Sequence, residues 1–213
     1  GLNRNVKGII NCAINKNLFK KKKIGVTEYL ASKCNVKDNS EAMLIKSKHL
    51  SVSPITTHID IKDVSKKIKT KMIIKKVKTI ELWLKKYLKR KPKIGILGLN
   101  PHNAELRENS EENRIIIPSI LKLKKTKINV KGPLVADTIF IDDYKNFDVI
   151  VGMYHDQVLT PFKALHKFDG INITLGLKYH RISPDHGVAA NLIGKNKANE
   201  TSLLQCINFM NNL

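Results

Sequence analysis

Several residue types are scarce in this 213-residue chain, and each scarcity excludes a class of protein. Its three cysteines, Cys12, Cys34 and Cys206, are far apart and form neither a CxxC metal clip nor a disulfide framework. Such usage is typical of a protein from a reducing cytoplasm. No apolar run approaches the roughly 18 residues of a membrane-spanning helix, and no basic-then-apolar secretory leader opens the chain. We therefore expect a cytoplasmic protein with no membrane partner.

Aromatic residues make up only 6% of the chain, although its formal net charge is +21. A strongly basic chain can bind nucleic acid, but proteins usually hold single-stranded nucleic acid by stacking its bases on aromatic rings. The lysines here are scattered through every segment and accompany many Asn and Ile residues, as AT-rich coding would produce. We therefore expect no nucleic-acid partner, and we expect the positive field to attract small anionic molecules.

Arginine is rare as well, since 34 of the 39 basic residues are lysines. The five arginines are Arg4, Arg90, Arg107, Arg114 and Arg181. A guanidinium presents a planar, two-pronged donor that matches a carboxylate or a phosphate, whereas a lysine presents only a point charge. Arg181 lies among other titratable residues and is therefore a candidate anion-binding residue.

The rest of the composition is that of a globular protein, with 42% hydrophobic and 27% charged residues and no internal repeat or long linker. Apolar runs predict strands at residues 6–13, 42–45, 49–54, 93–97, 148–151 and 171–175, and a loop feeding a short strand within 132–140. Helical spacing of apolar residues predicts helices around 63–73 and at 79–88, 115–123, 187–193 and 198–210.

The most informative stretch is 152–187, which is dense in titratable side chains. It follows the apolar run 148–151, and open α/β sheets build their sites where strands end in polar residues. In chain order it contains His155 beside Asp156, then Lys163, the strand 171–175, Arg181, and the triplet Asp185, His186 and Gly187. Taken singly, each residue also has a structural interpretation, because a histidine at a strand end is usually hydrogen-bonded in place and a lone lysine is usually solvated.

The motifs MYHDQ (153–157), INITLGL (171–177) and DHG (185–187) resemble those of the 4-hydroxythreonine-4-phosphate dehydrogenases of vitamin B6 biosynthesis, the PdxA family. The resemblance continues through GLNPH (98–102), GPLVADTIF (132–140) and TTHIDIKDV (56–64), and it covers nearly the whole chain. It implies an α/β fold like that of isocitrate and isopropylmalate dehydrogenases, with a mixed sheet flanked by helices and two subdomains that enclose the site in a cleft.

The resemblance also implies that residues 1–213 are the C-terminal part of such a dehydrogenase, with subdomain boundaries left open. The family's front portion, which includes a His-Thr pair that touches substrate, has no counterpart here. It further implies a homodimer with the site at the interface.

The resemblance assigns candidate roles residue by residue. Lys163, Asn172 and Arg181 occupy the positions that contact a phosphorylated substrate. His102 and His155 occupy two of the three metal-ligand positions, and Val26, which cannot coordinate a cation, occupies the third. Asp137, Asp156, Glu28 or water would complete the metal shell, and Asp137 and Asp156 are the candidates for catalytic work. The metal would be Zn, Co, Mg or Mn.

A second similarity concerns the dinucleotide. Residues 183–200 are similar to the nucleotide loop of isocitrate and isopropylmalate dehydrogenases, which implies that Asp185, His186 and Gly187 lie near NAD or NADP. A GxGxxG fingerprint is absent from the sequence, so an ordinary Rossmann site is not expected. A capping or loop role is the alternative for His186.

The implied reaction is the NAD(P)-dependent oxidation of 4-phosphooxy-L-threonine, followed by decarboxylation to 3-amino-2-oxopropyl phosphate. Two alternatives stay open. One is a related dehydrogenase that acts on threonate or erythronate phosphate. The other is a chain without activity, either an inactive truncated copy or a binding protein that uses its basic surface.

Overall fold

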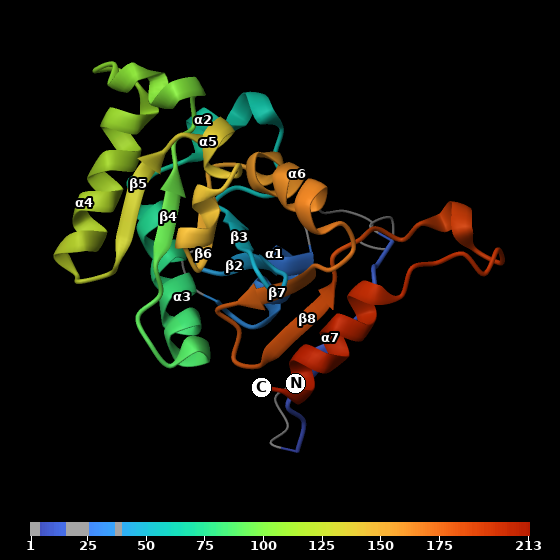
Figure 1. Cartoon of the computed structure of the whole chain (residues 1–213). Helices are drawn as coiled ribbons and strands as arrows, with labels where there is room; N and C mark the ends of the chain where they lie inside the picture. Colours follow the sequence, from blue (N-terminus) through green and yellow to red (C-terminus); the bar gives the residue numbers. More distant parts are fainter. Residues whose placement is uncertain (1–4, 16–25, 37–39) are drawn as a thin grey trace.

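The computed structural model describes residues 5–15, 26–36 and 40–213, apart from the side chain of Glu28. Its strands are β1 (Gly8–Ile10), β2 (Ala42–Lys46), β3 (Ser51–Pro54), β4 (Ile94–Leu97), β5 (Val130–Leu134), β6 (Val149–Gly152), β7 (Ile171–Leu175) and β8 (His180–Pro184). They form one mixed sheet of eight strands in the order β1-β8-β7-β2-β3-β6-β4-β5 (Figure 1). The run β3-β6-β4-β5 is parallel, as is the pair β1-β8, whereas β8-β7-β2-β3 is antiparallel.

Helices cover both faces of this sheet. The α-helices are α1 (Val26–Lys33), α2 (Val64–Lys67), α3 (Thr70–Leu88), α4 (Ile117–Lys125), α5 (Ala136–Ile139), α6 (His155–His166) and α7 (Thr201–Asn211). Shorter turns are η3 (Ile61–Asp63), η4 (Pro101–Leu106), η6 (Asp143–Asn146) and η7 (Ala190–Leu192), and a π-helical turn, η5 (Glu112–Ile116), leads into α4. Within the described residues, no helix combines the length and the apolarity needed to cross a bilayer.

The side chains of β2 show how the two layers of helices are held. Ala42 and Leu44 join the apolar cluster that α3, α4 and α7 cover, whereas Met43 and Ile45 join the cluster that α5 and α6 cover. Successive residues of a strand point to opposite faces, so a strand covered on both faces must be apolar throughout. The sheet is therefore the middle of three layers, with a core on each side.

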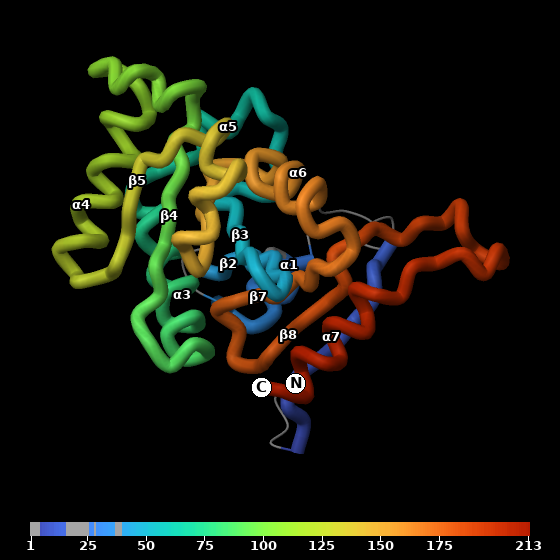
Figure 2. The backbone as a smooth tube through the Cα atoms, in the orientation of Figure 1, coloured from blue at the N-terminus to red at the C-terminus, as the bar shows by residue number. Residues whose placement is uncertain are grey.

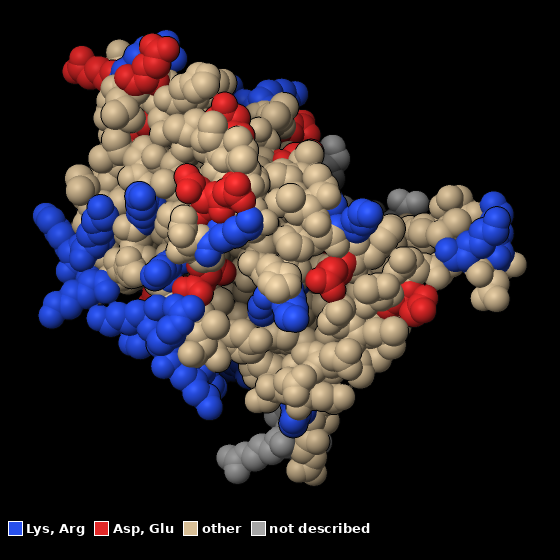
Figure 3. Space-filling model, in the orientation of Figure 1, with Lys and Arg blue, Asp and Glu red and all other residues tan. Residues whose placement is uncertain are grey.

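The beginning and the end of the described chain lie side by side (Figure 2). β1 pairs with the edge of β8, and α7 packs against both strands. The Lys7 ammonium donates to the Asn211 carbonyl at 3.4 Å. Lysine and arginine side chains gather over the side of the molecule that includes α4 and β5, and fewer of them lie near β8 and α7 on the face shown in Figure 3.

Most of the predicted elements are confirmed, with shifted ends. The helix predicted at 79–88 is the second half of α3, whose buried residues Ile73, Val77, Ile80 and Leu84 form one apolar stripe. α3 ends where Lys89 adopts a left-handed backbone with φ of 55°. The predicted strand 6–13 is shorter, because β1 is an edge strand that pairs only at Gly8–Ile10.

Three predictions of local structure are wrong. The helix predicted around 63–73 is interrupted, because the backbones of Ile68 and Lys69 are extended between α2 and α3. Within 132–140, where a loop feeding a strand was predicted, the strand β5 comes first and the helix α5 follows. Pro133 does not prevent strand formation there, because β5 is an edge strand and one side of its backbone needs no partner. The helix predicted at 187–193 is reduced to the three-residue turn η7, which has no buried residue and therefore no apolar face to stabilise a longer helix.

A buried carboxylate holds the loop that follows β4. Glu112 has no exposed surface, and its Oε1 accepts the backbone N–H groups of Leu99 and Asn100, both at 2.8 Å. Its Oε2 accepts the Asn100 side-chain amide at 3.0 Å. Burial by itself would raise the pKa of Glu112, but the hydrogen bonds from Asn100 and Leu99 outweigh burial and lower it. Glu112 thus fixes the start of the GLNPH segment.

Gln157 joins this loop to the loop that follows β6. Its Nε2 donates to the Gly98 carbonyl at 2.8 Å, and its Oε1 accepts the Met153 N–H at 2.7 Å. One side chain in the first turn of α6 therefore sets the distance between two loops at the same end of the parallel strands.

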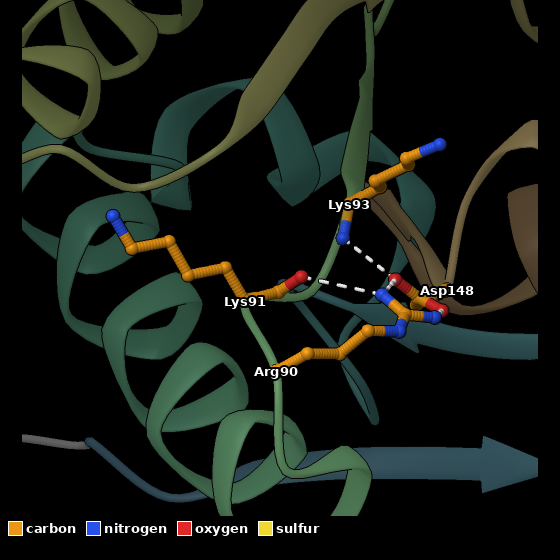
Figure 4. Close-up of polar contacts among 4 residues, drawn as sticks. All are labelled: Arg90, Lys91, Lys93 and Asp148. Atoms are coloured by element: carbon orange, nitrogen blue, oxygen red, sulfur yellow. Dashed lines mark hydrogen bonds and ion pairs between the residues drawn. The ribbon is translucent and has the colours of Figure 1, made fainter.

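At the opposite end of these strands, Asp148 ties the start of β6 to the segment that enters β4 (Figure 4). Arg90 donates to its two oxygens at 2.8 and 2.6 Å, and the Lys93 N–H donates at 2.7 Å. Burial by itself would raise the pKa of Asp148, but the bonds from Arg90 and Lys93 outweigh it and lower that pKa.

Replacing Asp148 should reveal this link through its pH dependence. Asp148→Asn keeps the side-chain size but removes the charge, so we expect a lower urea midpoint than the parent at pH 7. A carboxylate with a depressed folded pKa contributes stability above its unfolded value, about pH 4, and loses it as the pH falls through the folded pKa. The difference in urea midpoint between D148N and the parent should therefore become smaller below about pH 4.

Asp142→Asn provides the control. It breaks the Lys145–Asp142 pair, whose side chains are 63% and 75% exposed, and exposed pairs contribute little. Urea titrations of the three proteins at both pH values measure the effect. A D148N midpoint that equals the parent's at pH 7 contradicts the role of Asp148.

Replacing Glu112 should destabilise the fold. Glu112→Gln preserves the shape but turns one acceptor oxygen into an NH₂ group, which leaves at least one buried N–H without an acceptor. We expect the free energy of unfolding to fall by about 1–3 kcal/mol in urea titrations. Glu108→Gln, at an exposed position of the same segment, should match the parent. Equal stability of E112Q and the parent would show that the loop is held by other contacts.

Candidate functional site

A cavity of about 580 Å³ lies where β7, β8 and the first turns of α1 and α6 meet. Asn172 comes from β7, Arg181 and Ser183 from β8, and His155 and Lys163 from α6. The segment after β1 and the segment after β8 complete the wall. These residues meet because β7 and β8 pair side by side, with Asn172 opposite Ser183 and Thr174 opposite Arg181, so that their side chains share one face of the sheet.

Most of the predicted site residues line this one cavity. They are Val26, His155, Lys163, Asn172, Arg181, Asp185, His186 and Gly187. These residues thus lie together in one chain, and their roles toward substrate, dinucleotide and metal stay predictions.

Three other candidates lie outside the cavity wall. His102 is exposed in η4, where its backbone is left-handed with φ of 49°. Asp137 is exposed on α5. Asp156 has a side chain that is 78% exposed, and its Oδ1 lies 2.6 Å from Nδ1 of His155. The side chain of Glu28 lies outside the described residues.

Arg181 provides the dominant charge in the cavity wall. Only 3% of its surface is exposed, and its two hydrogen bonds go to neutral acceptors. Nε donates to Asn11 Oδ1 at 2.8 Å, and Nη1 donates to Thr174 Oγ1 at 3.2 Å. Burial lowers the pKa of Arg181 to about 10, so the guanidinium stays protonated at neutral pH. Among the described residues, no carboxylate forms an ion pair with it.

Lys163, in contrast, already has an acidic partner. Its Nζ lies 2.6 Å from Asp185 Oδ2 and also donates to the Asp185 backbone carbonyl. Burial raises the pKa of Asp185, and the nearby Lys163 offsets part of this shift. An anion that approaches Lys163 must therefore share the ammonium with Asp185. The positive charge without an acidic partner in this part of the chain is that of Arg181.

The imidazoles do not form a metal site within the described part of one chain. His58 and His155 both line the cavity, with ring centroids 6.0 Å apart. No group of three or more His, Cys, Asp or Glu side chains in the described ranges is arranged to hold a metal ion. Val26 contributes no donor to the wall, and His102 is not part of it. The described residues of one chain thus do not by themselves complete a site for the predicted cation, and no chemical step is assigned to a metal.

The side chains that surround the guanidinium of Arg181 were not predicted as site residues; they are Asn11, Thr174 and Thr27. Asn11 and Thr174 hold Arg181, and Thr27 Oγ1 lies 3.5 Å from Thr174 Oγ1. The available signals were a polar residue directly after an apolar run and a threonine inside an apolar strand. Neither signal identifies a partner, because the partner depends on which strands pair.

The sequence of this chain is similar to a known protein family and to several curated proteins. The family model described as "Pyridoxal phosphate biosynthetic protein PdxA" matches residues 1–210. A 4-hydroxythreonine-4-phosphate dehydrogenase from Aquifex aeolicus (strain VF5) is 44% identical over 213 residues, which cover 98% of this chain and 66% of that protein. A protein from Oceanobacillus iheyensis with the provisional name D-threonate 4-phosphate dehydrogenase is 38% identical, covering 86% of this chain and 55% of its own length. The chain thus spans between about half and two thirds of the length of these curated relatives.

Solved structures agree with the sequence comparisons. The crystal structure of 4-hydroxythreonine-4-phosphate dehydrogenase from Klebsiella pneumoniae matches with a TM-score of 0.83 at 32% identity, covering 96% of this chain and 63% of that one. Isocitrate dehydrogenase from Methylococcus capsulatus matches with a TM-score of 0.55 at 12% identity, covering 82% of this chain and 59% of that one, which shows a shared fold alone. The predicted isocitrate dehydrogenase-like α/β fold is confirmed. Since the family model also matches nearly the whole sequence, the chain belongs to the PdxA family of pyridoxal phosphate biosynthetic proteins.

Proposed function

We propose that the chain carries the substrate site of a dehydrogenase that oxidises 4-phosphooxy-L-threonine with NAD or NADP and decarboxylates the product to 3-amino-2-oxopropyl phosphate. The reaction belongs to pyridoxal 5'-phosphate biosynthesis, to which the name of the matching family refers. The observation that carries the proposal is the buried guanidinium of Arg181, which lines the cavity with no acidic partner among the described residues. A buried, uncompensated charge is costly, and an anionic ligand would offset that cost.

The other residues of the cavity suit the same substrate, which has a phosphate, a carboxylate, a hydroxyl and an ammonium group. The fork of Arg181 matches either anion in a bidentate contact. The buried Oδ1 of Asn172 has no hydrogen-bond partner in the described structure, so it is available to accept from a hydroxyl or ammonium group. Lys163 would add a second positive charge, shared with Asp185.

The proposed chemistry balances without a metal-dependent step. The nicotinamide ring accepts a hydride from the carbon that bears the hydroxyl group. The hydroxyl proton is released, and a β-keto acid forms. The bond to the carboxylate carbon then breaks, its electron pair moves toward the ketone to give an enolate, and carbon dioxide leaves. The carbon that bore the carboxylate takes up a proton from water, which gives the amino ketone product. The residues of the chain bind and orient the two anionic groups around this carbon.

The dinucleotide is proposed to lie near Asp185, His186 and Gly187, at the wall of the same cavity. Nδ1 of His186 lies 2.9 Å from the Gly187 carbonyl, which is a local contact that the alternative loop role also explains. A homodimer is part of the proposal as well. His102 is exposed outside the cavity of its own chain, and this leaves it accessible to a second copy.

A second candidate substrate is D-threonate 4-phosphate, which the name of the Oceanobacillus relative favours. Threonate has a hydroxyl group where phosphooxythreonine has an ammonium group. Asn172 Oδ1 can accept a hydrogen bond from either group, so this contact does not separate the two substrates.

A substrate panel tests the proposed reaction. We expect reduction of NAD or NADP with 4-phosphooxy-L-threonine, and a lower kcat/KM with D-threonate 4-phosphate and D-erythronate 4-phosphate. Absorbance of the reduced dinucleotide measures each rate, and released carbon dioxide measures the second step. A higher kcat/KM with threonate phosphate would favour the second candidate, and no turnover with any of the three contradicts both.

Arg181→Lys tests the binding role of the guanidinium. The variant keeps a positive charge but loses the planar fork, so we expect KM for the phosphorylated substrate to rise about tenfold or more. Arg114→Lys, at an exposed position in η5, should leave KM unchanged. Initial rates over a range of substrate concentrations measure both. If R181K retains the parent's KM, Arg181 does not contact the substrate.

A further inference from the structure

We propose that Asn11 and Thr174 are positioning residues, which hold the guanidinium of Arg181 in the orientation that receives an anionic group of the substrate. The identity of that anion rests on the proposed function, whereas the positioning itself rests on contacts within the chain. Asn11 lies outside the motifs that carry the resemblance, and Thr174 lies within INITLGL (171–177), where no role was assigned to it.

The sheet register explains why these three side chains meet. On β7, Thr174 lies directly opposite Arg181 of β8, and directly opposed residues of an antiparallel pair project to the same face. On the other side, Ile9 of β1 lies opposite Arg181. Asn11 is two residues beyond Ile9, and alternate residues along a strand share a face. Arg181 thus has one neutral acceptor from each neighbouring strand.

The two contacts engage two of the five N–H donors of the guanidinium and leave the other three free for a ligand. Nε donates to Asn11 and Nη1 donates to Thr174, whereas Nη2 makes no hydrogen bond to any other described residue. A guanidinium has five N–H donors in a fixed plane, so two anchored donors determine where the other three point. The remaining donors are thereby oriented before a ligand binds, which reduces the entropy cost of binding.

The anchors themselves are fixed. The Asn11 N–H donates to the Ile182 carbonyl at 3.2 Å, and its side-chain amide donates to the Cys12 carbonyl at 2.9 Å, which turns Oδ1 toward Arg181. Thr174 is 3% exposed, and its hydroxyl lies 3.5 Å from that of Thr27 at the start of α1.

The neutrality of both anchors is what suits them to this role. A carboxylate at either position would hold the guanidinium equally well but would cancel its charge. An amide and a hydroxyl satisfy the donors and leave the full charge available to the substrate. A purely structural role would instead make these residues matter for stability alone, so ligand affinity must be measured separately from folding.

The test compares matched variants of the full chain. Asn11→Leu and Thr174→Val remove the acceptors with little change in size, and Thr174→Ser retains the hydroxyl. Asn11→Asp retains the acceptor but adds a negative charge. Asn208→Leu, at an exposed position of α7, is the control. Calorimetry with 4-phosphooxy-L-threonine and with inorganic phosphate, without dinucleotide, gives Kd. Thermal unfolding gives Tm, and initial rates with dinucleotide give KM and kcat.

We expect N11L and T174V to raise both Kd and KM about tenfold, because each removes a hydrogen bond to a charged group, while kcat stays within about twofold. T174S should bind like the parent, as should N208L. N11D should keep the parent's Tm but lose most of its affinity, because its carboxylate competes with the ligand for Arg181.

The outcomes separate this proposal from the reaction proposed above. If the parent chain binds the ligand but shows no turnover, and N11L and T174V weaken that binding, the positioning role is supported and the proposed reaction is overturned. Unchanged Kd in N11L overturns the positioning role whatever the activity, even if T174V fails to fold. Full affinity in N11D overturns it as well, and so does a parent chain that binds neither probe.

Discussion

The site depends on a guanidinium that is buried without an acidic partner in the described structure. Removing an ion from water costs several kcal/mol unless hydrogen bonds and an opposite charge compensate for the loss. Arg181 cannot avoid this cost by deprotonating, since even after burial its pKa is about 10. Hydrogen bonds to two neutral acceptors offset part of this desolvation cost, and a bound anion would offset the rest. These two hydrogen bonds require β8 to lie between β1 and β7, with each pair of strands in its observed register.

This requirement explains why a mixed sheet serves the site. β8 pairs antiparallel with β7 and parallel with β1, so its residues have close neighbours on both sides. On the other half of the sheet, Glu112, Gln157 and Asp148 fix the loops and the starts of the parallel strands. α6 connects the two halves, because Gln157 and His155 lie in its first turn and Lys163 lies near its end. The cavity thus lies beside β7 and β8, and α6 links its wall to the parallel half of the sheet through Gln157.

Sequence reasoning succeeded where the information is local. The apolar run 171–175 forms the predicted strand, and Ile80 and Leu84 of the helix predicted at 79–88 are buried in α3. The titratable residues between 152 and 187 converge because they belong to consecutive elements. Asn11 was overlooked because its importance arises from strand register over a separation of 170 residues. The start of β5 and the short helix α5 were missed around 132–140, because an edge strand of five residues and a helix of four leave little periodicity in the sequence.

Within the described residues, the electrostatic character of the cavity follows from the unpaired charge of Arg181 more than from the +21 of the whole chain. Lys163 is largely neutralised by Asp185, and the same carboxylate is then less available to a cation. Val26 makes the wall more apolar at the point where a donor is expected, and a less polar wall strengthens the attraction between Arg181 and an anion. A divalent cation in the same cavity would instead meet an uncompensated guanidinium and a carboxylate already engaged by an ammonium. The arrangement of charges in the described chain therefore favours the anion over the cation, and any cation would have to bring its compensating donors from outside this wall.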